Sequence, residues 1–219
     1  MILHPFPDED GASVIIHAPS TPSALAAWSD PAQSACVVPG GPLPAALNGI
    51  AFAPCALPDA QVNTRSASAA EEPPFDLPPG FKAAAGVVIL EPDGRVWLVA
   101  PTNGFGGYAA TFPKGRADPG ASLPATAVRE AWEEAGLLVS IERFLLDVRR
   151  TQTYTRYYLA RRVGGSPAAM GWETQAAHLV PMAQLGAMAA HANDAAIIAA
   201  LENVIALAPP IRHSGHCPK

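Results

Sequence analysis

The sequence predicts a mixed α and β domain preceded by a long acidic, proline-rich extension. Short continuous apolar runs after residue 81 are typical of buried strands, and one later segment carries matching start and stop signals of a helix. Strands and helices do not alternate as in a doubly wound sheet, so a mixed sheet is favoured. The 219 residues suffice for one large domain, or for one medium domain with an appendage.

Charge and proline content divide the chain into unequal parts. Residues 1–80 hold eight acidic residues, a single arginine and 14 of the 24 prolines, whereas the remainder is nearly neutral. We therefore expect an N-terminal extension or small subdomain with a linker over residues 1–79, a main domain over 80–210 and a flexible tail over 211–219.

The extension also contains short apolar runs at residues 13–17, 35–38 and 49–53. Such runs fit either a small subdomain docked on the main body or a largely extended arm. We expect docking, through residues 14–16 and 50–52.

Composition excludes several classes of protein. No run of eighteen apolar residues occurs, and the first ten residues lack the basic and apolar segments of a signal peptide. The three cysteines form no CxxC pair, so we expect neither a zinc site nor a disulfide framework, and a cytoplasmic location. The near-neutral main domain has no basic surface for duplex nucleic acid, and no membrane partner is expected.

The expected elements of the main domain follow one another without long gaps. A turn at residues 91–94 joins two apolar strands into a predicted hairpin, and Asn193 or Asp194 caps the last helix. The expected strands are 84–90, 95–100, 137–148, 151–163 and 176–180, and the expected helices are 123–135, 181–191 and 194–207.

Chemistry concentrates on the first of these helices, which Ser122 caps and Gly136 ends. Glu130, Glu133 and Glu134 lie three and four residues apart, so their carboxylates share one helix face. Like charges this close repel, and one arginine, Arg129, cannot neutralise them. A hard cation such as Mg²⁺ or Mn²⁺ would do so, because it prefers carboxylate and water oxygens; a solvated acidic face is the alternative.

Residues 115–137 resemble the Nudix box, the signature of hydrolases that act on a nucleoside diphosphate linked to another moiety. Ala131 is a weak fit to an aliphatic position, and Ala121 stands where the family has glutamate. The positions that match are Gly115, Arg129, Glu130, Glu133, Glu134, Gly136 and Leu137.

The resemblance implies an α/β/α sandwich with a mixed sheet and hydrolysis of a diphosphate bond with Mg²⁺ or Mn²⁺. By position, the resemblance makes Glu130 and Glu134 metal ligands. Glu133 becomes either a further metal ligand or the base that deprotonates water, and Arg129 holds the Glu133 side chain in place. Glu173 lies where the family often has a further loop carboxylate, and becomes a third catalytic candidate; an ordinary turn before a strand is the alternative.

The departure at Ala121 leaves two functions open. In the family the missing glutamate chiefly supports the box through ionic contacts, and Asp118 could compensate for it. The first function is therefore a pyrophosphohydrolase with loosened metal binding. The second is a catalytically weak Nudix-like module with a nucleotide-binding or regulatory role.

The substrate contacts are expected from three places. Residues 111–116 resemble a motif of the Nudix branch that cleaves diadenosine and diphosphoinositol polyphosphates, so Lys114, Gly115 and Arg116 are candidates, although Lys114 also fits a plain loop charge. Arg156, between two tyrosines on one strand face, could hold phosphate, or could lie on a solvent face. Tyr108 could stack on a base, or pack on the body. The expected partner is a small phosphorylated molecule, and a homodimer is compatible with the resemblance.

Overall fold

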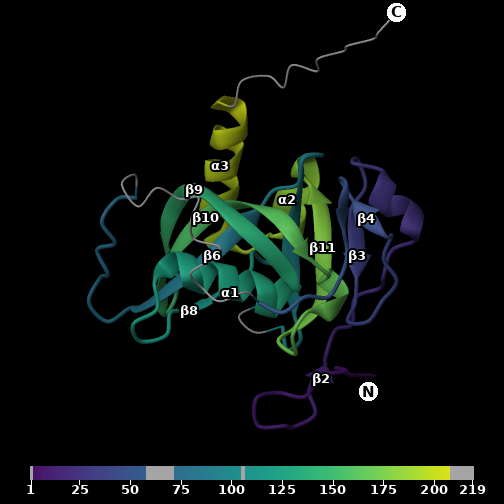
Figure 1. The fold of residues 1–219 in the computed structure, drawn as a ribbon. Helices are drawn as coiled ribbons and strands as arrows, with labels where there is room; N and C mark the ends of the chain where they lie inside the picture. Colours follow the sequence, from purple (N-terminus) through teal and green to yellow (C-terminus); the bar gives the residue numbers. More distant parts are fainter. Residues whose placement is uncertain (1, 58–71, 105–106, 208–219) are drawn as a thin grey trace, which may run out of the picture.

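A computed structural model describes residues 2–57, 72–104 and 107–207. The predicted flexible tail and most of the predicted linker lie outside these residues. The described chain forms a helix–sheet–helix arrangement, with a second, smaller sheet at one side (Figure 1). The predicted mixed-sheet sandwich is therefore confirmed.

The mixed sheet has four strands in the order β8, β6, β10 and β9. Strand β6 pairs in parallel with β10 and antiparallel with β8, while β9 and β10 are antiparallel. The bounds are Lys114–Arg116 for β8, Lys82–Ile89 for β6, Thr153–Gly165 for β10 and Leu137–Arg149 for β9. The sheet is thus assembled from strands that lie far apart in the sequence.

The predicted hairpin of residues 84–90 and 95–100 is wrong, although its turn forms. Only Leu90 and Val96 make a bridge between the two strands. Strand β6 already has a neighbour on each edge, so β7 (Arg95–Pro101) leaves it and pairs with β11 (Thr174–Pro181) in the second sheet. The third strand of that sheet, β3 (Ala35–Val37), comes from the N-terminal extension.

Helices cover both faces of the mixed sheet. Helix α1 (Leu123–Ala135) lies on one face, and α3 (Ala192–Leu207) packs on the other beside α2 (Met182–Met188). Alternate residues of the strands enter the two cores: Tyr158 faces α1 and Tyr157 faces α3, as a strand's period of two requires. No helix in the described ranges is long and apolar enough to cross a membrane.

The last helix begins two or three residues earlier than predicted. Asn193 and Asp194 lie inside its first turn instead of capping it. The Asp194 carboxylate is buried and accepts from Arg150 over 3.2 Å. The side chain that the sequence suggested as a helix cap is therefore used in an ion pair with a distant residue.

The N-terminal extension contributes several short elements. Strand β3 is an edge strand of the second sheet, and the extension also forms the 3-10 helix η1 and the two small hairpins β1–β2 and β4–β5. The bounds are Ile2–Leu3 for β1, Ile15–Ile16 for β2, Leu25–Ser29 for η1, Ala46–Leu47 for β4 and Ile50–Ala51 for β5; a last short 3-10 helix, η3, spans Pro167–Ala169.

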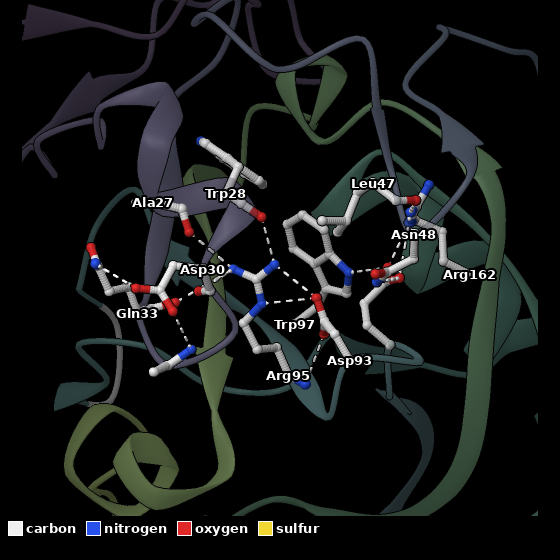
Figure 2. Close-up of polar contacts among 12 residues, drawn as sticks. Ala27, Trp28, Asp30, Gln33, Leu47, Asn48, Asp93, Arg95, Trp97 and Arg162 are labelled. Carbon is white, nitrogen blue, oxygen red and sulfur yellow. Dashed lines mark hydrogen bonds and ion pairs between the residues drawn. The ribbon is translucent and has the colours of Figure 1, made fainter. Parts of the chain in front are cut away.

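Two buried arginines bind the extension to the main body (Figure 2). Arg95 on β7 donates to the carbonyl oxygens of Ala27 (3.1 Å) and Trp28 (2.7 Å). Arg162 on β10 donates to the Leu47 carbonyl over 2.8 Å. Trp28 itself is 1% exposed within the same core as α1. Of the two runs expected to dock, residues 50–52 reach this core through Phe52, whose ring packs against Trp28, while residues 14–16 pair with β1. The boundary at residue 79 stays a prediction.

Candidate active site

Helix α1 presents the predicted glutamates because both of its ends are fixed as the sequence suggests. The Ser122 side chain accepts from the amide of Ala125 over 3.3 Å, and Gly136 ends the helix in the left-handed region with φ of 66°. A left-handed terminus of this kind suits glycine, which has no Cβ to clash. Both ends of the helix are therefore fixed, and with them the places of the carboxylates at positions 130, 133 and 134 along it.

Strand β8 supplies the floor of the candidate site. The Lys114 amide donates to the Glu134 carboxylate over 2.7 Å. A Cβ atom on Gly115 would collide with the Glu130 carboxylate, so only glycine lets this side chain lie against the strand. Glu130 is consequently 5% exposed.

Arg129 is shared among several acidic groups. Its guanidinium lies 2.6 Å from Glu133 and 2.9 Å from Glu130, and it also donates to the Arg116 carbonyl over 3.0 Å. Asp118 lies 3.6 Å away on its outer side. Asp118 thus stands in an ionic contact with the box arginine while Ala121, where the family has glutamate, offers no carboxylate.

Burial and mutual repulsion both disfavour the ionised form of the three helix glutamates. Burial raises the pKa of Glu130 to about 8, and repulsion from Glu134 adds to that shift. Burial raises the pKa of Glu134 to about 7 despite the nearby charge of Lys114, and burial also raises the pKa of Glu133 against the pull of Arg129. Groups held this way are neutral more often than ordinary carboxylates, which is characteristic of functional sites.

A divalent cation fits the chemistry of these donors. Mg²⁺ and Mn²⁺ prefer carboxylate oxygens, and the charge of a cation would favour the ionised carboxylates that burial and mutual repulsion disfavour. Across residues 2–57, 72–104 and 107–207, no three Asp, Glu, His or Cys side chains converge as a ready-made metal site. Two of the glutamates instead point to Arg129, which supplies positive charge at this place.

Glu173 comes to the same place from a distant part of the chain. Its negative charge contributes to the raised pKa values of Glu130, Glu133 and Glu134, so it lies close to them. Two contacts fix its loop: the Gly171 amide donates to the Glu133 carbonyl over 2.7 Å, and the Thr102 amide donates to the Glu173 carbonyl over 2.9 Å. The side chain itself is exposed.

The other predicted residues fall into two groups. Lys114, Gly115 and Arg116 form β8 and border the glutamates, with Arg116 exposed and 3.3 Å from the Gln152 amide oxygen. Tyr108 lies elsewhere, where its ring stacks on His191 at 4.0 Å between centroids and its hydroxyl oxygen accepts from Arg150.

Arg156 is also engaged within the protein. It is 2% exposed, binds both oxygens of Asp147 over 2.8 Å, and lies under Glu72 and Phe75 from the segment before β6. Its assignment to substrate binding, like that of Tyr108, stays a prediction.

Sequence reasoning missed three groups that support this region. Thr102 and His4 hold the Glu173 loop, and Arg150 pairs with Asp194 beneath Tyr108. The sequence carries no periodic pattern or motif that marks them, because each acts on a residue more than forty positions away.

Comparison with known proteins identifies the family. The model of the NUDIX domain matches residues 80–201, which is more than half of the chain. The chain therefore belongs to the NUDIX family, and the resemblance predicted from residues 115–137 is confirmed.

Individual relatives cover less of the chain. Two proteins named RNA pyrophosphohydrolase, from two strains of Caulobacter vibrioides, are 38% identical over 98 residues, which are 44% of this chain and 54% of each relative. The chain spans about half the length of these curated relatives. Solved structures that are similar include a C. elegans Ap4A hydrolase in a binary complex (21% identity, 57% of this chain and 98% of that one, TM-score 0.48) and a NUDIX hydrolase from Nitrosomonas europaea (18% identity, 59% and 75%, TM-score 0.49).

Proposed function

We propose that the protein is a metal-dependent pyrophosphohydrolase that cleaves a diphosphate bond in a nucleoside diphosphate linked to another moiety. Dinucleoside polyphosphates are the substrate class that we favour. The observation that carries the proposal is the cluster of Glu130, Glu133 and Glu134 on α1, with Arg129 paired to the first two, the Lys114 amide bound to the third, and raised pKa values on all three. A site that leaves carboxylates under-neutralised suits a cation-dependent reaction.

The residues divide the work as follows. Glu130, Glu133 and Glu134 would hold Mg²⁺ or Mn²⁺, with Gly115 admitting Glu130 and the Lys114 amide orienting Glu134. A bound divalent cation supplies charge withdrawal from the diphosphate and lowers the pKa of a water molecule. Glu133, oriented by Arg129, or Glu173 on its fixed loop, accepts the proton of the attacking water.

Substrate contact is assigned to the basic side chains of β8. Lys114 is half-buried and Arg116 exposed beside the acidic group, so both can meet phosphate oxygens. The relative named RNA pyrophosphohydrolase makes a 5′-triphosphorylated oligoribonucleotide a second substrate worth including.

A catalytically weak nucleotide-binding or regulatory module is the alternative function. Ala121 favours it, because the family glutamate that supports the box is missing. The 3.6 Å contact between Asp118 and Arg129 supports the enzyme instead, since it supplies an acidic partner from a nearby position.

The test is a substrate panel with the full chain: diadenosine tetraphosphate, ADP-ribose and the triphosphorylated oligoribonucleotide. Products are identified in Mg²⁺, in Mn²⁺ and in excess chelator. We expect cleavage that depends on metal, together with a higher melting temperature when metal is added, because a ligand that binds the folded state stabilises it. Full activity in chelator contradicts the metal assignment. Nucleotide binding by calorimetry with no cleavage in either metal establishes the alternative function.

A further inference from the structure

The N-terminal hairpin lies directly against the loop that carries Glu173. His4 follows strand β1 and is 6% exposed, although most of the residues around it are exposed. Its Nε2 atom lies 3.1 Å from the carbonyl oxygen of Thr174, the residue after Glu173. This hydrogen bond joins residues 170 positions apart in the sequence.

Both ring nitrogens of His4 have hydrogen-bond partners. A carbonyl oxygen can only accept, so Nε2–H donates to the Thr174 carbonyl. Nδ1 lies 3.1 Å from both the amide nitrogen and the carbonyl oxygen of Phe6. Both ring nitrogens are therefore used, one to orient the ring and the other to hold the loop.

Neighbouring residues of the extension hold the same loop. Thr102 donates to the Glu173 carbonyl from its amide (2.9 Å) and from its hydroxyl (3.1 Å), and the His17 amide donates in turn to the Thr102 carbonyl over 3.2 Å. The Ser20 amide donates to the Gln175 side chain over 2.8 Å. Glu173 and the first two residues of β11, Thr174 and Gln175, are thus fixed by residues 4 to 20 or by groups that those residues hold.

The far end of the loop is tied to the glutamate helix. The Gly171 amide donates to the Glu133 carbonyl over 2.7 Å. The loop therefore spans from α1 to the N-terminal hairpin, with Glu173 between the two attachments. Because the Glu173 side chain is exposed, its position depends on its backbone and not on packing.

From these contacts we propose that His4 is a positioning residue, through which the N-terminal hairpin fixes Glu173 beside the glutamates of α1. The inference rests on the proposed pyrophosphohydrolase function. A group that reacts with an attacking water loses rate steeply when its position loosens, because a displacement of about 1 Å can cost up to about 100-fold. His4 itself touches no reacting atom.

The test compares His4→Ala with His4→Gln, whose side-chain amide can replace the Nε2 donor, and with His17→Ala, which removes an exposed ring from the same hairpin and keeps its backbone amide. We expect His4→Ala to lower kcat by about 10-fold with KM within about twofold. His4→Gln restores most of kcat, and His17→Ala matches the wild type.

Amide hydrogen exchange of the full chain without substrate gives a readout that does not depend on activity. We expect the amides of Thr102 and Thr174 to exchange faster in His4→Ala than in His17→Ala. Unchanged exchange at both amides, or a kcat equal to that of the wild type, overturns the positioning role. If the wild type cleaves no substrate, the proposed function falls, while the exchange result still decides whether His4 fixes the loop.

Discussion

Two regions of the molecule bury charge in opposite ways. At the junction with the N-terminal extension, the side chains of Arg162 and Glu91 are both 0% exposed and lie 2.6 Å apart. Arg162 also donates to the carbonyl oxygens of Leu47 (Figure 2) and Ile50. Glu91 also accepts from the Trp97 indole over 2.8 Å. Arg162 and Glu91 thus neutralise each other, and each also makes further hydrogen bonds at this junction.

On α1 the balance is different. Glu130, Glu133 and Glu134 have Arg129 and Lys114 as their nearby cations, and burial raises the pKa of all three. A buried charge with every hydrogen bond satisfied holds two parts of a fold together. Carboxylates without enough positive charge weaken the fold at neutral pH and leave a place for a cation. The difference separates a structural cluster from a functional one within a single chain.

The largest expected effect comes from breaking the structural cluster. Arg162→Met leaves the Glu91 carboxylate buried without its partner, which costs about 3–5 kcal/mol in the free energy of unfolding. Arg161→Met is the matched control, because Arg161 is the preceding residue of the same strand, its side chain is 62% exposed and it lies 3.9 Å from Glu142. Denaturant unfolding measures both variants. Equal stability of the two would show that the buried pair does not hold the extension.

Neutralising a carboxylate of the functional cluster should have the reverse effect on stability. Glu134→Gln keeps an acceptor for the Lys114 amide and removes one of the repelling charges, so we expect an unchanged or higher melting temperature without metal. Turnover should fall by at least about 100-fold if Glu134 holds the metal. Glu142→Gln, an exposed acid on β9, is the control. Full turnover in Glu134→Gln, or a marked loss of stability, would contradict the contrast between the clusters.

The smallest expected effect concerns the half-buried His178. Burial lowers the pKa of His178 on β11 to about 4, and its register neighbours are Cys36 on β3 and Leu98 on β7. The unfolded chain therefore takes up a proton near pH 6.5 and the folded chain does so only near pH 4, so this residue reduces stability as the pH falls between those values.

His178→Gln should make the melting temperature fall less steeply between pH 7 and pH 4 than it does in the wild type. The exposed His17 provides the control substitution, His17→Gln, which should leave the slope unchanged. Parallel melting curves of wild type and His178→Gln would rule out this contribution.

The sequence predicts those features of the fold that depend on residues close together in the chain. The cap at Ser122, the end at Gly136 and the spacing of Glu130, Glu133 and Glu134 are local features, and they fix α1 and its acidic face. The partner of β7 depends on which edges of β6 are already taken, which no local pattern encodes. The two loop attachments of Glu173 are likewise hydrogen bonds to distant backbone groups, so only the structure reveals them.

The Arg95 contacts constrain the backbone of the N-terminal extension more than its side chains. This guanidinium contacts the main chain of residues 27–33, where it donates to the carbonyl oxygens of Ala27, Trp28, Asp30 and Gln33. Every residue type offers that oxygen, so substitutions that preserve the backbone path leave the attachment intact. An attachment of this kind places almost no constraint on the side chains of the residues that it contacts. The composition of the extension can therefore vary while the extension remains bound.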